Sequence, residues 1–545
     1  MLEIKSHLTK HKIAHYLWLI MAIVLIFAVF FLRFYRLPEY LMFLSDQGRD
    51  AIVLKRLVTL EKLVFVGPTT SIGNVFTGPF YYYLVAPFML LSGLHPVGPA
   101  FGIAFMNSLG LVGAFWFVVK RFGRNVGLIF LPLAGLSATQ IWQSRYSWNP
   151  NPVPLFTFLT LIVWQLAIER KRLRYYILAG VLFGLSLQLH YIAIVILAPL
   201  IYSLFKDVVL YIRLHVPKTS HYILLSIRNI LTKILLFIGA CIATFAPLIM
   251  FEIKNSFINT QTFLRATSTS EIQAKNSVYL DRLRDTCAGF LQHLFLIEVN
   301  RDVALSLVVV SIFVVVYLAL RDKHMRSQFI IWSLILIIAN ILTLSLLETG
   351  RHVHYYNPSY WFAYLVMAYV MTSTGREIHI LLGKSYSTKI VLFVYSLIVL
   401  TVLNIFVQTQ VGSLNFLTDR PKKDTQITNA QKVAKYIISQ ISSKQYQVVG
   451  LPFFEIEGHF RYFLEYYNHR PMPADALGDP QELFVICHEL DKPDCDIPGN
   501  PQWQIADFQN RHQDWRVESV KLVEEVRVFK LVYGENDKIP MTNDK

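Results

Sequence analysis

Long apolar runs separated by short polar segments dominate roughly the first 410 residues of the chain. About 20 consecutive apolar residues cross the hydrocarbon core of a bilayer as one helix, and most of these runs approach that length. The pattern therefore predicts a polytopic α-helical membrane protein. The runs lie at about 14–32, 78–93, 97–119, 126–142, 152–168, 175–205, 230–251, 303–320, 329–347, 358–374 and 389–408.

The basic residues between the runs decide which runs cross the membrane. If every run crossed once, the clusters Lys120–Arg124 and Glu169–Arg172 would both face outward, against the positive-inside rule. The run at 78–93 contains Pro87 and three tyrosines, which favour a broken helix at the interface. We therefore expect 78–93 to return to the outer surface without crossing, so that both basic clusters lie inside.

The run at 175–205 requires a second decision, because a single helix of that length would span about 46 Å, well beyond the bilayer. Basic residues flank it on both sides, so both of its ends are expected inside. We expect it to cross and return, with the turn near Gln188–Tyr191. The result is about eleven spans, with the N-terminus inside and outer loops at 33–96 and 252–302.

The chain changes character near residue 410, where the apolar runs end. Alternating apolar positions and connections rich in Pro and Gly then predict a small α/β extracytoplasmic domain over 410–545, after a membrane domain over 1–409. The elements that we expect in this tail are a helix at Asn429–Ile441 and strands at Gln447–Leu451, Leu483–His488, Arg516–Val523 and Glu525–Val532.

The composition agrees with a membrane protein, since 54% of the 545 residues are hydrophobic and only 16% are charged. The formal charge of +15 lies mainly in short loops between the runs, so the positive-inside rule explains it better than nucleic-acid binding. Cys487 and Cys495 stand eight residues apart in the tail. The sequence leaves open whether they form a disulfide or remain thiols.

The first outer loop holds the densest candidate chemistry, in the segment 45–50 that reads SDQGRD. An amphipathic helix is expected to follow, suited to lying along the membrane interface. The carboxylates of Asp46 and Asp50 would then lie near the lipid headgroups, beside Arg49. A structural interpretation competes, because Asp commonly caps a helix N-terminus, and we favour that role for Asp50.

Two further outer segments carry candidate binding residues. Arg145 and Asn149 lie in the polar loop after the run at 126–142. Arg145 suits a phosphate, and it equally suits snorkelling to the lipid headgroups. His190 stands at the expected turn in 175–205. A histidine in such a place makes a structural hydrogen bond more often than it binds an anion.

The last outer loop combines Arg351, His352, His354 and Tyr355 in a compact cationic and aromatic patch. Phosphate prefers such a patch, and its own field would favour protonation of the histidines. A metal site built on His352 and His354 would have only Glu348 as a nearby carboxylate. We therefore expect no metal site here.

Four motifs in a fixed order resemble the GT-C superfamily of polytopic glycosyltransferases. Within it, the chain looks like the branch of protein O-mannosyltransferases, aminoarabinose lipid A transferases and RgtA-B-C-D-like enzymes. The resemblance covers about residues 15–375. Its motifs are Asp46–Asp50, Gly78-Pro79 with its tyrosines, Lys120–Arg124, and Ala179–Leu185 running into His190.

The resemblance implies an inverting glycosyltransferase that takes a sugar from a polyprenyl-phosphate donor on the outer face of the membrane. Asp46, the acid of the first loop, would be the general base toward an acceptor hydroxyl. The acceptor (a lipid, a glycan or a protein) is not identified. No cofactor is implied, and a role for a divalent metal stays open. The expected location is the cytoplasmic membrane of a prokaryote, among its lipids.

By the same resemblance, the leaving lipid phosphate would be held by cations such as Arg351, with Arg145 and His190 nearby. Two departures weaken the match. Gln47 follows Asp46 where many relatives have a second acid, and Asn149 stands in a loop where many relatives have Asp. An amide orients a substrate but cannot act as a base, which concentrates the chemistry on Asp46 or Asp50.

The alternative function is a transporter, a flippase or a polymerase of cell-surface glycans. Transport would place ionisable residues in the middle of the membrane. The expected spans carry almost no charge apart from Lys233, close to an inner end. This absence of charge favours the transferase.

Overall fold

The computed structural model describes residues 2–70, 75–215, 220–268, 278–322, 326–347, 351–383, 386–422, 424–451, 457–473, 479–488, 495–512 and 514–533. The chain divides into two compact units, each of which is described by itself. The membrane unit comprises Met1–Leu37, Val64–Val85 and Ala100–Asp419. The tail unit comprises Pro38–Leu63, Ala86–Pro99 and Arg420–Lys545.

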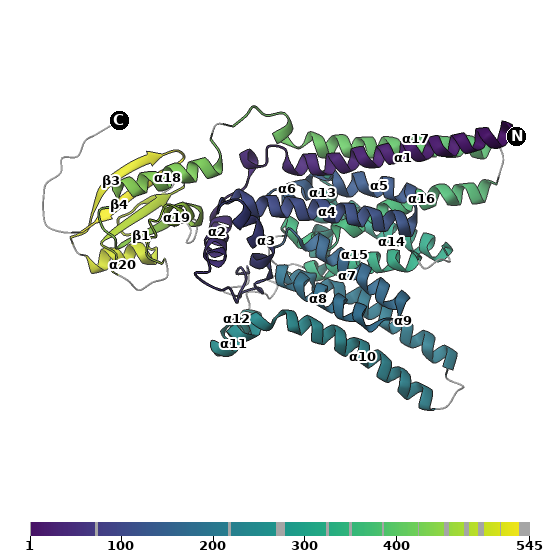
Figure 1. Ribbon diagram of the computed structural model, residues 1–545, viewed down its shortest axis with the longest axis horizontal. Helices are drawn as coiled ribbons and strands as arrows, with labels where there is room; N and C mark the ends of the chain where they lie inside the picture. Colours follow the sequence, from purple (N-terminus) through teal and green to yellow (C-terminus); the bar gives the residue numbers. More distant parts are fainter. Residues whose placement is uncertain are drawn as a thin grey trace. The chain divides into compact units, whose positions relative to one another are not determined.

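Figure 1 shows the helices that precede residue 420, and every apolar run overlaps with at least one of them. They are α1 (Leu2–Phe34), η1 (Pro38–Tyr40), α2 (Ser45–Val58), α3 (Phe80–Leu91), α4 (Val97–Phe122), α5 (Arg124–Gly135), α6 (Ala138–Ser144), α7 (Val153–Arg170), α8 (Leu173–Leu189), η2 (Tyr191–Ile196), α9 (Leu197–His215), α10 (Ser220–Thr244), α11 (Ala246–Lys254), α12 (Ile258–Ser268), α13 (Tyr279–Phe295), α14 (Arg301–Arg321), α15 (Arg326–Leu346), η3 (Val353–Tyr356), α16 (Tyr360–Leu382), α17 (Tyr386–Gly412) and η4 (Asn415–Leu417).

Within the described residues, seven helices are long and apolar enough to cross a membrane, or nine if two bent pairs each count as one span. The fold is thus that of a polytopic helical membrane protein, but the expected count of eleven is not confirmed. Two of the eleven expected spans, α8 and α16, are not among these nine. Helix α8 is only 17 residues long, and the buried part of α16 is rich in tyrosine.

Two runs expected as single straight spans are each broken into two helices. Helices α5 and α6 meet at 60°, and α10 and α11 meet at 61°. Ser137 caps the N-terminus of α6, where its hydroxyl accepts a hydrogen bond from the backbone of Gln140. Pro247 stands in the first turn of α11, where its ring fits but could not continue a regular helix from α10.

The two segments singled out from their charge pattern both depart from ordinary spans. Helix α3 has 12 residues with Pro87 inside it, too short to cross a bilayer. The run at 175–205 is interrupted at His190, whose backbone is extended between α8 and η2. The break falls where the turn was expected.

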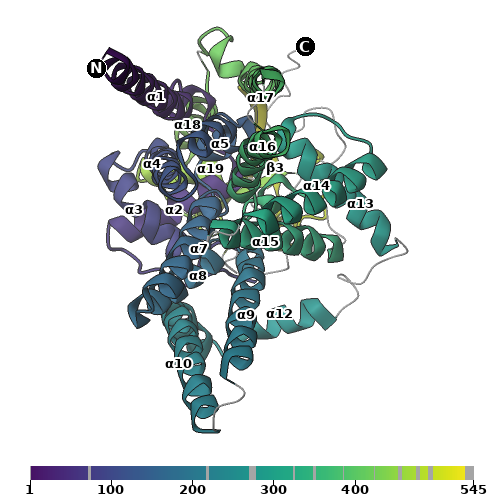
Figure 2. The ribbon, with the colours of Figure 1, turned by 90° about the vertical axis from the view of Figure 1, so that its right-hand side faces the viewer.

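Large aromatic side chains fill the centre of the membrane unit, which Figure 2 shows almost along its helices. On α16, Tyr360, Trp361 and Tyr364 are fully or almost fully buried. Their polar atoms have partners across the core: Trp361 Nε1 donates to Gln140 Oε1 at 3.1 Å, and the Tyr364 hydroxyl donates to Ser137 Oγ at 2.8 Å. A polar belt thus joins α16 to α6 inside an apolar bundle.

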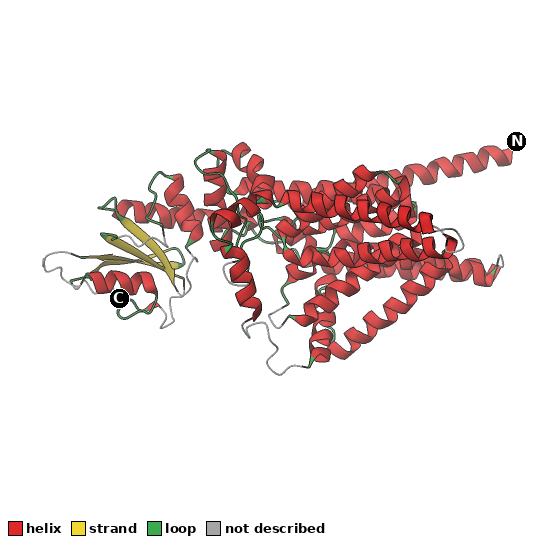
Figure 3. Ribbon diagram, turned by 90° about the horizontal axis from the view of Figure 1, so that it is seen from below, coloured by secondary structure: helices red, strands yellow, loops and turns green. Residues whose placement is uncertain are grey.

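The tail unit contains a mixed four-stranded sheet, drawn in yellow in Figure 3. Its order is β1-β2-β4-β3, with β1 and β2 parallel and the other pairs antiparallel. Side chains of α20 pack on one face of the sheet and α18 lies on the other. Its elements are α18 (Gln426–Gln440), β1 (Tyr446–Leu451), α19 (Gly458–Tyr466), β2 (Glu482–Cys487), α20 (Trp503–Arg511), β3 (Arg516–Val523) and β4 (Val526–Val532).

The predicted tail helix and all four predicted strands are confirmed to within three residues at their ends. Helices α19 and α20 were not anticipated, because each has only nine residues and no strong cap in the sequence. Cys487, the last residue of β2, is bonded to Cys495. The question that the sequence left open is thus answered in favour of a disulfide.

Candidate functional site

The candidate acid Asp46 stands in the first turn of α2, in the tail unit. Its side chain is 47% exposed, and its Oδ1 atom lies 3.1 Å from Nη1 of Arg49. Gln47, which replaces a second acid, has a local role: its Oε1 accepts a hydrogen bond from the backbone of Leu44 at 3.1 Å. The amide thereby satisfies one of the N–H groups at the start of the helix.

Asp50 does not cap this helix, so that expectation was wrong. The N-cap position belongs to Leu44, and Asp50 lies in the second turn with only 1% of its surface exposed. Its Oδ1 accepts hydrogen bonds from Nε and Nη2 of Arg49 at 3.2 and 3.1 Å. Arg49 therefore bridges two carboxylates, one open to solvent and one buried.

Helix α2 packs against α19, a contact that we had not anticipated. The two backbones approach most closely at Gly48 and Gly458. A methyl group on Gly48 would overlap the backbone of Gly458 and His459, and a methyl group on Gly458 would overlap the carbonyl oxygen of Ser45. A glycine inside a helix costs about 1 kcal/mol relative to alanine, so Gly48 in the SDQGRD segment was the one available signal of this contact.

An ion cluster around the buried carboxylate of Glu465 extends the contact between α2 and α19. Glu465 of α19 accepts hydrogen bonds from Lys55 at 3.3 Å and from Arg56 at 3.1 and 2.7 Å, and Arg470 binds it at 2.9 Å. Burial alone would raise the pKa of Glu465, but the hydrogen bond from Arg56 and the surrounding cations hold it below its ordinary value. The acid-bearing helix is thus fixed to the tail sheet unit by charge as well as by close packing.

In the membrane unit, a second group of candidate residues gathers where two loops meet the break at His190. Asn149 Nδ2 donates to the carbonyl oxygen of Leu189 at 2.7 Å, and Asn357 Nδ2 donates to that of Pro150 at 2.7 Å. Both amides are buried and satisfy backbone acceptors that water does not reach. Asn149 therefore fastens its loop to the end of α8.

The rings of Trp148, His190, His352, His354 and Tyr355 form what we call the histidine cluster. His354 is at its centre, with centroid distances of 4.4 Å to Tyr355, 4.5 Å to Trp148, 5.4 Å to His190 and 5.7 Å to His352. Trp148 was not among the residues that we expected at the site. Its aromatic character next to Asn149 was visible, but its partner two hundred residues away was not.

Burial keeps two members of this cluster neutral. It lowers the pKa of His190 to about 4, and burial with the neighbouring His190 and His352 lowers the pKa of His354 to about 2. His190 Nδ1 accepts the backbone N–H of Ile192 at 3.2 Å, which makes its other ring nitrogen the donor. Two histidines at this expected cationic patch are thus held neutral by burial, and Arg351 remains as its cation.

Arg351 carries the positive charge beside the cluster. Its Nε atom donates to Thr286 Oγ1 on α13 at 2.7 Å, and Tyr356 donates to the Thr286 carbonyl oxygen at 3.1 Å. Among the residues that the structure describes, buried Nη2 of Arg351 has no hydrogen-bond partner. One side of the guanidinium is therefore anchored, and the other is available to an acceptor.

Arg145 does not reach the surface, so it does not snorkel to headgroups. It is fully buried, its Nη1 donates to the carbonyl oxygen of Leu32 at 2.9 Å, and its guanidinium lies 3.9 Å from the centroid of the Phe416 ring. Arg33 lies beside it and binds Ser144 and Gly135. These contacts tie α1, α6 and the segment after α17 together.

No group of three or more His, Cys, Asp or Glu residues in the described parts of the chain is placed to hold a metal ion. Glu348, the carboxylate named with His352 and His354, lies outside those parts. The acid-bearing helix and the histidine cluster belong to different units, and each is characterised by its own contacts.

No family model matches the sequence, and no curated protein matches it. Solved structures do match. ArnT from Cupriavidus metallidurans bound to undecaprenyl phosphate is 11% identical, with a TM-score of 0.55 over 94% of this chain and 97% of that one. Its apo form is 10% identical, with a TM-score of 0.56 over 96% and 100%.

The apo oligosaccharyltransferase of Archaeoglobus fulgidus is 13% identical, with a TM-score of 0.50 over 84% of this chain and 64% of that one. All three structures are of GT-C glycosyltransferases, so the chain has the GT-C fold. The fold that the four sequence motifs suggested is confirmed.

The close approach of Gly48 and Gly458 predicts a specific sensitivity. Gly458→Ala should speed hydrogen exchange in the backbone of α2, because the added methyl group meets the Ser45 carbonyl and overpacking costs about 1–3 kcal/mol. Alanine is the better helix former, so helix propensity alone would act in the opposite direction. Gly412→Ala is the matched control, since its methyl group would meet nothing within 4 Å. Unchanged exchange in α2 would contradict this packing.

The neutral His354 predicts a pH dependence of stability. The unfolded chain protonates this histidine below about pH 6.5, whereas the folded chain does not, so stability should fall by up to about 2 kcal/mol between pH 6.5 and pH 5. The melting temperature of His354→Gln should therefore decrease less between pH 6.5 and pH 5 than that of the unsubstituted protein. The exposed His379→Gln is the control. Equal losses in all three proteins would exclude a buried neutral His354.

Proposed function

We propose that this chain is an inverting glycosyltransferase that moves a sugar from a polyprenyl-phosphate donor to an acceptor hydroxyl, with Asp46 as general base. The observation that carries the proposal is the GT-C fold, which extends over 94% of the chain in the comparison with ArnT bound to undecaprenyl phosphate. The identity of the sugar and of the acceptor is left open.

The different surroundings of the two acids favour Asp46 as the base. Its half-exposed carboxylate has one free side toward solvent, as a group that accepts a proton from a substrate needs. Asp50 is buried and bound by Arg49, so its part is to hold Arg49, which in turn orients Asp46. Asp50 and Arg49 are then positioning residues.

The proposed reaction is a single displacement. Asp46 takes the proton of the acceptor hydroxyl as its oxygen forms a bond to the anomeric carbon. The bond from that carbon to the phosphate oxygen breaks on the opposite side, and the lipid phosphate leaves with the electron pair. One carboxylate acting as a base gives inversion at the anomeric carbon. The proton and the phosphate both leave the site with the products.

Arg351 is the residue that we assign to the lipid phosphate. Its unpartnered Nη2 is the donor best placed to take an anionic oxygen, with a charge-assisted hydrogen bond. The neutral rings of His190 and His354, with the Tyr355 hydroxyl, offer further donors within the histidine cluster. Arg145 is buried among Leu32 and Phe416, and we assign it to the structure of the site.

The disulfide supports an outward-facing tail. Structural disulfides persist in oxidising compartments and are rare in the cytosol. Cys487 and Cys495 are bonded in the tail unit, which also carries Asp46. An outer-face reaction agrees with this, and so does the charge pattern of the loops.

Asp46→Asn should reduce sugar transfer by about 10²–10⁴-fold, because the amide cannot accept the acceptor proton. The assay is release of radiolabelled sugar from a panel of polyprenyl-phosphate sugars by the purified full-length protein. Asp424→Asn is the matched control: this aspartate belongs to the same unit, is 53% exposed, and pairs with Lys432 as Asp46 pairs with Arg49.

Equal transfer by Asp46→Asn and the unsubstituted protein would remove Asp46 from the role of base. Failure of the unsubstituted protein to use any donor of the panel would contradict glycosyl transfer itself. Loss of activity in both Asn variants would point to a general effect of charge on the tail unit.

Arg351→Gln should raise KM for the lipid-linked donor by about tenfold, because one charge-assisted hydrogen bond to the phosphate is lost. The control is Arg301→Gln, which removes an exposed arginine engaged with Asp281 and Asp285. The measurement is KM against kcat with increasing donor. An unchanged KM in Arg351→Gln would show that the phosphate binds elsewhere.

A further inference from the structure

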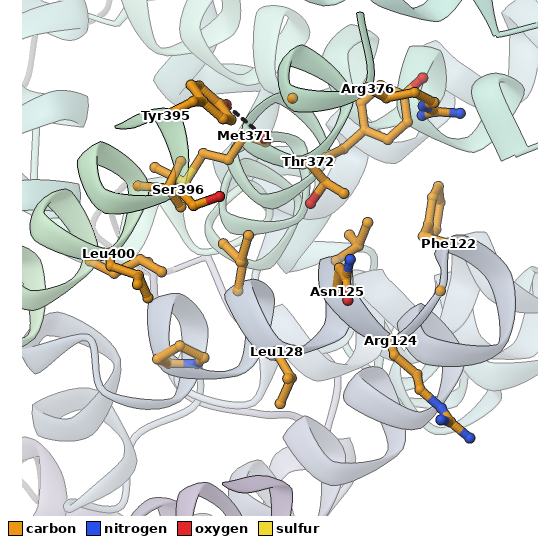
Figure 4. Close-up of a pocket in the computed structure, with 18 of the residues that line it drawn as sticks. Phe122, Arg124, Asn125, Leu128, Met371, Thr372, Arg376, Tyr395, Ser396 and Leu400 are labelled. Carbon is orange, nitrogen blue, oxygen red and sulfur yellow. Dashed lines mark hydrogen bonds between the residues drawn. The ribbon is translucent and has the colours of Figure 1, made fainter. Parts of the chain in front are cut away.

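A cavity of about 1020 Å³ lies within the membrane unit, among residues of α1, α5, α16 and α17 (Figure 4). None of the residues assigned above to glycosyl transfer lines it. Its site is therefore separate from the histidine cluster and Arg351, and its purpose is not explained by the proposed reaction.

The cavity is apolar along most of its length. Its lining includes Leu25, Ile129, Leu392, Val399 and Leu403. Two further lining residues, Met21 and Leu400, are 52% and 61% exposed. In a membrane-spanning bundle such surfaces face lipid chains, so the cavity is open to the bilayer.

One end of the cavity is cationic. Figure 4 shows Arg124 and Arg376 at the same end, with Leu400 toward the other. Among the described residues, Arg124 has no ion pair, and its guanidinium lies 5.1 Å from the ring centroid of Trp18. Arg376 is 45% exposed; its Nη2 donates to Ser373 Oγ at 3.0 Å, and its Nη1 lies 3.7 Å from Oδ2 of Asp322, a long ion pair.

Neighbouring arginines at this end of the bundle are already neutralised. Arg121 pairs with Glu169, and Arg321 binds Glu377 at 3.0 Å. Arg124 and Arg376 line the cavity, and their positive charge is not fully neutralised by the contacts described above. An apolar channel that ends in two incompletely neutralised guanidinium groups is complementary to an amphiphile with an anionic head.

We propose that this cavity binds an anionic phospholipid of the surrounding membrane, with its phosphate held by Arg124 and Arg376 and its acyl chains along the apolar lining. The lipid would also fill the space beside α17, where this helix has few contacts with the rest of the bundle. Helix α17 is hardly buried by the protein, and its residues Leu392 to Leu403 form one wall of the cavity. Bound lipid would connect α17 to α5 and α16.

The test uses purified, delipidated full-length protein mixed with equal amounts of phosphatidylglycerol and phosphatidylcholine that carry the same chains. Native mass spectrometry then counts the retained lipids. The unsubstituted protein should prefer phosphatidylglycerol, and the double variant Arg124→Gln/Arg376→Gln should lose about tenfold of that preference. Arg172→Gln, which removes an exposed arginine outside the cavity, should keep it.

A second variant separates binding from folding. Ser396→Trp adds bulk at an exposed position on the cavity wall and keeps both arginines, so it should reduce retention of phosphatidylglycerol while the bundle stays folded. Equal retention of the two lipids by the unsubstituted protein would overturn the proposal. So would a preference that survives both variants, or displacement of phosphatidylglycerol by an equal amount of undecaprenyl phosphate, which would assign the cavity to the donor.

Discussion

A helical bundle in a bilayer cannot leave backbone groups unpaired, because hydrocarbon offers them no hydrogen bonds. Every break in the helices of the membrane unit must therefore be closed from within the protein. Side-chain amides do this at three places: Asn149 binds the end of α8, Asn357 binds the loop after α6, and Gln410 accepts the first backbone N–H of α6 at 2.8 Å. The amides close the breaks, and the closed breaks in turn fix the loops on which the histidine cluster stands.

The acid-bearing helix depends on a different constraint, which is close backbone packing. Gly48 and Gly458 let α2 and α19 approach until no side chain fits between them, and Glu465 with its three cations secures the crossing. The acid-bearing helix and the histidine cluster are thus each held by contacts within their own unit. Preorganised groups lose little freedom when a substrate arrives, which is the condition for efficient general-base catalysis.

The sequence predicted those features that repeat locally. Runs of apolar residues located nearly every long helix, and alternation located the four tail strands, because each pattern extends over many residues. Features set by one distant contact were missed. The sequence around His354 gives no sign that Trp148 and His190 contact it. Asp50 was expected to cap α2 because Asp is common at that position, and its burial depends on contacts within the tail unit that the sequence does not show. The expected count of eleven spans is not confirmed because of α8 and α16. Whether these two helices need to be long and apolar depends on how they pack, which the sequence does not show.

The central claim is displacement at the anomeric carbon by an acceptor oxygen that loses its proton to a single carboxylate. The stereochemistry of the product tests this most directly. Proton NMR of the product formed from a donor of known anomeric configuration should show the opposite configuration, since one displacement inverts the centre. Retention of the donor configuration would contradict it, because retention requires a second nucleophile or a covalent intermediate.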